Sequence, residues 1–132
     1  MTGYITLGTN ELEKAAVFYD TLLEKFGAAR TYSLERMIAW GSDPAKPMLV
    51  VTKPSDGNTA RPGNGNMIAL ICKDTDHVRA VHKLAVRPGA ENVSPPAEYG
   101  GQFFGDYFRD LDGNKICVFV MSQDTTAPVS ED

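Results

Sequence analysis

Apolar and polar residues follow the same order in the two halves of the chain. In the first half, residues 4–9 form a short run that predicts a strand. Asn10 is a good N-cap for the helix that follows, whose apolar residues return at helical spacing until Gly27 can end it. Three strand-like runs come next, near residues 29–34, 36–41 and 47–53.

The second half repeats this order. Residues 67–72 predict a strand, and Asp74 or Thr75 can cap a helix that ends at Pro88 and Gly89. Each half is therefore predicted to fold as β-α-β-β-β. A proline-rich strand or loop and two further strands complete the second half, near residues 91–97, 102–109 and 115–121.

Residues 54–66 separate the two halves and are polar and rich in glycine. Neither a helix nor a Lys-Ser/Thr pair follows them, so they are predicted to be a linker and not a phosphate-binding loop. We expect a single domain over 1–122, with one module at about 3–53 and a second at 67–121. Residues 123–132 are expected to form a flexible tail.

Composition narrows the possible functions. The 132 residues are 42% hydrophobic and 23% charged, which is ordinary for a soluble globular domain. A formal charge of −4 argues against a nucleic-acid partner, and the longest apolar runs are too short for a membrane span. Cys72 and Cys117 make no disulfide framework, and the N-terminus lacks the pattern of a secretory signal. A cytoplasmic location is therefore expected.

Two stretches give the chain a resemblance to a known family. Residues 5–20 combine an opening strand with a helix that carries the pair Phe18 and Tyr19, and residues 107–116 form a hairpin around the turn 112–114. Together with the doubled pattern, they resemble the vicinal oxygen chelate superfamily of glyoxalase I, extradiol dioxygenases, and fosfomycin-resistance and bleomycin-binding proteins. The resemblance implies an α+β fold, in which two β-α-β-β-β modules form an open, cup-shaped mixed sheet with the helices outside. It also implies a homodimer.

Enzymes of that family hold a divalent metal in the cup, through side chains on the opening and closing strands. The resemblance places these positions at Tyr4, Met67, Cys117 and in the strand 47–52. A catalytic metal needs about three ligands from histidine, acidic residues or cysteine, and only Cys117 qualifies. Both histidines of the chain lie on the predicted second helix, outside the cup. We therefore predict no metal, no cofactor and no catalytic residue.

Alternation along the strands predicts which side chains face the cup. The residues that parity places there are Tyr4, Thr6, Met67, Ala69, Lys115, Cys117 and Phe119. The candidate ligand-binding residues are Tyr4, Trp40, Met67, Phe104, Tyr107, Cys117 and Phe119. Lys115, Arg109 and Thr6 are candidates for polar contacts to the ligand. The competing interpretation is that some of these residues fill the core or a dimer interface.

Three functions remain open. The favoured one is metal-independent binding of a small apolar or aromatic molecule in the cup. The second is a lyase, isomerase or dioxygenase of glyoxalase I type with unusual metal ligation. The third is a protein-interaction module. A reactive Cys117 thiolate beside Lys115 and Arg109 is a separate hypothesis, set against an inert buried cysteine.

Overall fold

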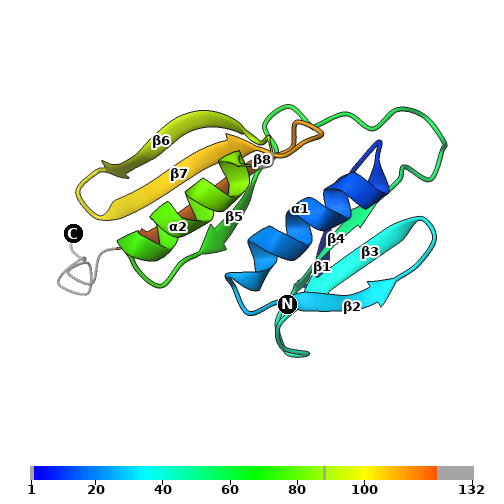
Figure 1. Cartoon of the computed structure of the whole chain (residues 1–132), viewed down its shortest axis with the longest axis horizontal. Helices are drawn as coiled ribbons and strands as arrows, with labels where there is room; N and C mark the ends of the chain where they lie inside the picture. Colours follow the sequence, from blue (N-terminus) through cyan, green and yellow to red (C-terminus); the bar gives the residue numbers. More distant parts are fainter. Residues whose placement is uncertain (1, 88, 122–132) are drawn as a thin grey trace.

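The computed structural model describes residues 2–87 and 89–121, which form two four-stranded sheets and two helices (Figure 1). The tail expected at 123–132 lies outside the described residues. The first module contains β1 (Tyr4–Gly8), α1 (Leu12–Glu24), β2 (Ala29–Ser33), β3 (Met37–Gly41) and β4 (Met48–Thr52). The second contains β5 (Ile68–Ile71), α2 (Thr75–Val86), β6 (Glu91–Tyr99), β7 (Phe103–Arg109) and β8 (Lys115–Met121). The α+β fold with its doubled order of elements is confirmed.

Each sheet is mixed and has its first strand at an edge. The strand orders are β1-β4-β3-β2 and β5-β8-β7-β6, with β1 parallel to β4 and β5 parallel to β8. The other neighbours are antiparallel. Figure 1 shows the two modules side by side, with α1 and α2 on the same side of the molecule. The sheets are open and separate, so each module presents one face to its helix and one face away from it.

The core lies between the helices and the sheets and is continuous across the modules. On α1 the buried residues return every three or four positions, as expected for an amphipathic helix. On α2 the residues Val78, Val81 and Ala85 are fully buried in the same way. Phe108 of β7 and Ile116 of β8 meet α2 from the sheet and are also fully buried. Alternation along β7 and β8 therefore places Phe108 and Ile116 on the helix-facing side of the second sheet.

The proline-rich segment is a strand. β6 runs from Glu91 to Tyr99 and includes Pro95 and Pro96. It is the outer strand of its sheet, where a residue without an N–H is tolerated, and its register with β7 shifts between Asn92 and Ala97. Edge position and irregular pairing together explain why this sequence can be extended.

The turn between β7 and β8 joins the two modules. Gly113 in this turn has φ +91°, which the predicted tight turn requires. The carboxylate of Asp110 is 6% exposed and accepts the Tyr19 hydroxyl of α1 at 2.5 Å. It also accepts the backbone N–H groups of Asp112 and Asn114, both at 2.9 Å, and the Asn114 side-chain amide at 3.0 Å. The hairpin of the second module is thereby bonded to the first helix.

The same turn also contacts the segment just before α1. Asp112 accepts the Asn10 backbone N–H at 2.9 Å and the Thr9 hydroxyl at 2.6 Å, at the positive end of the helix dipole. The prediction that Asn10 is the N-cap is wrong, because the N-cap residue is Glu11. The Asn10 side chain instead bonds to the linker at Ala60, donating to its carbonyl oxygen and accepting its N–H.

The second helix begins as predicted. Asp74 is its N-cap and accepts the His77 backbone N–H at 2.8 Å. The helix ends at Val86, just before the expected stop, and Gly89 beyond it has φ +114°. Within the described part of the chain, no helix is long and apolar enough to cross a membrane.

Candidate functional site

Four aromatic rings gather on the face of the second sheet that points away from α2, called here the open face. This aromatic cluster consists of Tyr99, Phe103, Tyr107 and Phe119. Phe103 and Phe119 are stacked, with ring centroids 5.2 Å apart and an interplanar angle of 11°. Tyr99 lies edge-on to Tyr107 at 5.9 Å and tilted to Phe103 at 6.1 Å. The cluster spans three adjacent strands, β6, β7 and β8.

Three of the residues expected to face the cup belong to this region. Tyr107 and Phe119 are in the aromatic cluster, and Cys117 is paired with Tyr107 across β7 and β8. Phe103 was missed, although it has the same strand parity as Tyr107. Tyr99 was missed because it follows a proline-rich stretch that was predicted to be either a strand or a loop. Without an assigned strand, alternation cannot show which way a side chain points.

Trp40 and Phe104 do not lie with the cluster, and their assignment to the cup is corrected. Trp40 is buried, its indole Nε1 donates to Asp20 of α1 at 2.8 Å, and its ring is 5.8 Å from that of Tyr19. Phe104 lies under the guanidinium of Arg79 on α2, at 5.0 Å. Both side chains therefore face the helices and contribute to the core.

Tyr4 and Met67 lie at the border between the modules. They precede or begin the edge strands β1 and β5, and both are exposed, at 59% and 45%. Tyr4 is paired with Met48 of β4, but the position on β4 that corresponds to Cys117 is Val50, because Thr6 pairs with Val50 as Ala69 pairs with Cys117. The four positions that the family resemblance assigns to a metal thus carry a phenol, a thioether, a thiol and an aliphatic side chain.

This donor set does not fit a divalent metal. Among residues 2–87 and 89–121, no group of three histidine, cysteine or acidic side chains is placed to hold an ion. His82 lies behind the second sheet, where its Nδ1 is 2.7 Å from the fully buried carboxylate of Asp106. His77 lies near the end of α1, with Nε2 2.8 Å from the carbonyl oxygen of Lys25. Both histidines are outside the open face, as expected.

The two thiols have environments that favour the neutral form. Burial raises the pKa of Cys117, which is 1% exposed, and this effect exceeds the opposing effects of Tyr107 and Lys115. Burial also raises the pKa of Cys72, to about 12. A reactive cysteine needs an accessible thiolate, so the geometry favours the inert interpretation of Cys117.

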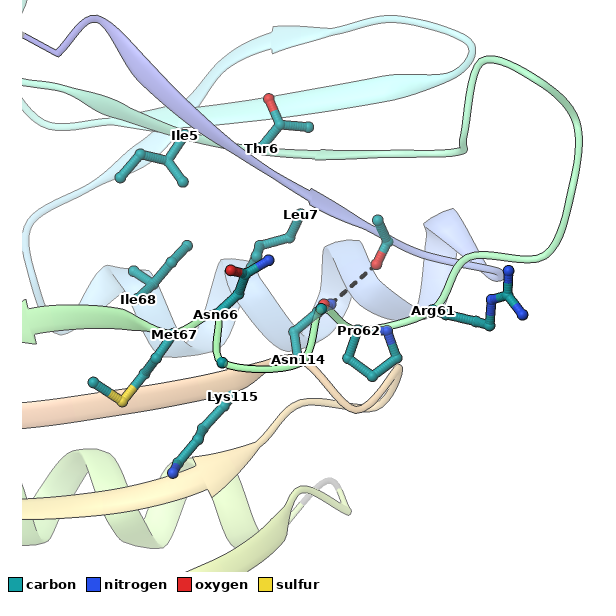
Figure 2. A pocket seen from close by; sticks show the side chains of 13 residues that line it. Ile5, Thr6, Leu7, Arg61, Pro62, Asn66, Met67, Ile68, Asn114 and Lys115 are labelled. Carbon is teal, nitrogen blue, oxygen red and sulfur yellow. Dashed lines mark hydrogen bonds between the residues drawn. The ribbon is translucent and has the colours of Figure 1, made fainter.

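Two adjoining pockets lie where the edge strands of the modules meet the linker. The junction pocket, of about 420 Å³, lies between β1 and the start of β5 (Figure 2). Asn114 borders it and donates to the Gly8 carbonyl oxygen at 3.0 Å, the bond dashed in Figure 2. The linker pocket, of about 590 Å³, shares several lining residues with it, including Asn66, Met67 and Lys115, and adds Arg109.

Lys115 connects these pockets to the aromatic cluster. Its Nζ lies 5.4 Å from the centre of the Tyr107 ring. In Figure 2 its side chain extends from β8 away from β1, whereas Arg61 extends from the other end of the pocket. The cationic group of Lys115 is therefore beside the aromatic face, and that of Arg61 is not.

Comparisons with known proteins agree on one family. The sequence model of the Glyoxalase/Bleomycin resistance protein/Dioxygenase superfamily matches residues 2–118. A comparison with curated proteins gives no match. A glyoxalase/bleomycin resistance protein from Albidiferax ferrireducens T118 has a similar structure, with a TM-score of 0.83 and 28% identity over 91% of this chain and 98% of its own.

Two more distant structures share the fold. A putative glyoxalase from Bacillus halodurans has a TM-score of 0.77 and 17% identity, over 91% of this chain and 95% of its own. A glyoxalase-related enzyme from Fulvimarina pelagi has a TM-score of 0.73 and 23% identity, over 91% and 87%. The similarity covers both modules in each case.

Proposed function

This chain belongs to the glyoxalase/bleomycin resistance protein/dioxygenase superfamily, and from that premise we propose that it binds a small aromatic or apolar molecule without a metal ion. The binding surface is the open face of the second sheet, on and beside the aromatic cluster. The observation that carries the proposal is the cluster itself, since four rings in mutual contact face away from the core.

Surface aromatics of this kind are typical of ligand sites. Tyr99 and Met121 are partly exposed near the cluster, so a ligand ring can reach the apolar surface. Stacked and edge-on contacts with a further ring stabilise a complex beyond simple burial of area. The hydroxyls of Tyr99 and Tyr107 and the amine of Lys115 supply the few polar groups that orient a ligand in a mostly apolar site.

Ligand binding is expected to raise the thermal stability of the protein. A small aromatic such as 2-naphthol, present at 100 times its dissociation constant, should add about 2.7 kcal/mol to the free energy of unfolding. Phe119→Leu removes the stacked partner of Phe103 and should weaken binding about three- to tenfold. Differential scanning fluorimetry over a ligand series measures both effects.

Tyr32→Leu is the matched control, because Tyr32 is an exposed aromatic on the outer strand of the other sheet. It should leave the affinity unchanged. A panel of aromatic and apolar compounds that never shifts the unfolding midpoint would contradict the proposal.

Metal independence has its own expected result. After dialysis against EDTA, the unfolding midpoint and the affinity for 2-naphthol should both be unchanged. The purified protein should carry less than about one-tenth of a metal ion per chain by elemental analysis, because the available thiol and thioether groups cannot hold a hard divalent ion. Near-stoichiometric metal, or a midpoint that falls on chelation, would favour the alternative of a glyoxalase-type lyase or dioxygenase.

A second copy of the chain is the partner that we propose for the exposed apolar residues at the border of the modules. Ile71 of β5 is 73% exposed, and Tyr4 and Met67 are also largely exposed. A two-fold interface that covers this border would remove apolar surface from water. Sedimentation equilibrium distinguishes a homodimer from a monomer.

A further inference from the structure

Two cationic side chains lie directly opposite each other at the closed end of the β7–β8 hairpin. Arg109 and Lys115 are register partners, so both point to the open face. Like charges at such a position destabilise a sheet unless an anion lies near them. Arg109 donates to the Gly113 carbonyl oxygen at 3.0 Å, which holds its guanidinium at the end of the hairpin. Two positive charges therefore lie side by side in a chain with a net charge of −4.

Within the described part of the chain, no carboxylate forms an ion pair with either cation. Over residues 2–87 and 89–121, the ion pairs are Lys14–Glu11, Arg30–Asp20 and His82–Asp106. Glu91 is the register partner of Arg109 on β6, yet it forms no ion pair with either cation.

The acids of the hairpin turn are used elsewhere. Asp110 accepts the Tyr19 hydroxyl and Asp112 accepts groups at the start of α1. Both carboxylates are thus bonded to the first module. Their oxygen atoms accept hydrogen bonds from these groups and form no ion pair with Arg109 or Lys115.

The linker completes a recess around the two cations. The linker pocket is lined by linker residues 62–66 and Met67 together with Arg109 and Lys115, and among its described lining residues none is acidic. The linker contributes small glycines and two asparagines, Asn64 and Asn66, whose side-chain amides can donate hydrogen bonds. A carboxylate or phosphate group fits this combination of two cations and neutral donors.

Lys115 links the recess to the aromatic cluster. It lines the linker pocket, and its Nζ is 5.4 Å from the Tyr107 ring centre. A molecule with a ring against the aromatic cluster therefore has a cation within reach of a short substituent.

We propose that Lys115 and Arg109 bind the anionic group of the ligand, so that the ligand is an aromatic acid: an aryl or arylalkyl carboxylate or phosphate. This inference rests on the proposed function, because the ring of the ligand occupies the aromatic cluster. The inference adds the chemical class of the ligand and names the two side chains that select this class.

The test compares two probes that differ in charge only at one substituent. We expect 2-naphthoate to bind the full chain at least about tenfold more tightly than the neutral 2-naphthylmethanol, as one charge-assisted hydrogen bond provides. Lys115→Met should reduce this preference to less than about threefold, because it should weaken the binding of 2-naphthoate much more than that of 2-naphthylmethanol. Lys115→Arg keeps the charge and should restore the preference. Isothermal titration calorimetry measures the six affinities.

Two control variants separate a local effect from a general change of charge. Lys83→Met removes an exposed lysine on α2, away from the open face, and should leave the preference intact. Glu91→Gln removes the acidic register partner of Arg109 and should strengthen 2-naphthoate binding about twofold or more. The 2-naphthoate affinity should fall as salt is added, and that of the alcohol should not.

The possible failures differ from one another. Equal binding of both probes, with no effect of Lys115→Met, would overturn the anion site and leave the proposed function standing. Absence of binding by either probe would overturn both. Binding of inorganic phosphate alone, with no chemical-shift change at Tyr107 or Phe119, would show an anion site uncoupled from the cluster and would overturn the aromatic-acid class.

Discussion

Replacing Phe108 with alanine is expected to lower the free energy of unfolding by about 3–5 kcal/mol. The side chain is 0% exposed and packs between β7 and α2 in the continuous core. Its removal leaves a large cavity that the rigid sheet cannot close. Urea unfolding followed by circular dichroism measures the change. Because such a loss approaches the whole stability of a small domain, Phe108→Leu provides a milder version that should remain folded.

Tyr107→Ala is the matched control for this prediction, since Tyr107 is the preceding residue on the same strand and faces the opposite way. It should cost less than half as much stability and should weaken aromatic ligands about tenfold. The two substitutions should therefore separate stability from binding. A greater loss of stability for Tyr107→Ala than for Phe108→Ala would contradict the assignment of the two faces.

Asp110→Ala is expected to destabilise the protein by a similar amount, about 3–5 kcal/mol. The nearly buried carboxylate accepts four hydrogen bonds, from the Tyr19 hydroxyl, two backbone N–H groups and the Asn114 amide. Alanine leaves these donors without a partner. Burial, together with the nearby charge of Asp110, raises the pKa of Tyr19 well above its ordinary value, so the phenol stays protonated and able to donate.

A series of variants tests whether the hydrogen bonds of Asp110, here called the hairpin joint, cause this loss of stability. Tyr19→Phe removes one donor and should cost about 1–2 kcal/mol. Asp56→Ala, in the exposed linker, removes a carboxylate with one local bond to the Asn58 N–H and should change stability by less than about 0.5 kcal/mol. If Asp110→Ala is no more harmful than Asp56→Ala, the joint does not stabilise the fold as described.

The order of helices and strands could be predicted because its signals are local. Alternation on β7 and β8 reflects burial on one face, and the spacing on α1 and α2 reflects packing against a sheet. Both patterns are read within a few residues. The same parity distinguishes Tyr107 on the open face from Phe108 in the core, and it could have identified Phe103.

The errors come from residues whose partners are distant in sequence. Tryptophan is common both in ligand sites and in cores. The hydrogen bond from Trp40 to Asp20 of α1 shows that this side chain faces the helix. Asn10 has the chemistry of an N-cap, yet Glu11 is the N-cap residue and the Asn10 side chain bonds to Ala60, which is 50 residues away. The neighbouring charges of Arg109 and Lys115, in contrast, follow from the turn between them and were within reach of sequence reasoning.

The contact between Asp112 and the start of α1 also bears on the order in which the chain can fold during synthesis. The ribosome releases the first module before the hairpin that contains Asp112, and domains commonly begin to fold as they emerge. Until that hairpin is made, α1 has neither the carboxylate at its start nor the acceptor for Tyr19. Contacts of such long sequence separation form slowly because a large loop must close first. The first module can therefore form its contacts with Asp112 and Asp110 only after the last pair of strands has been synthesised.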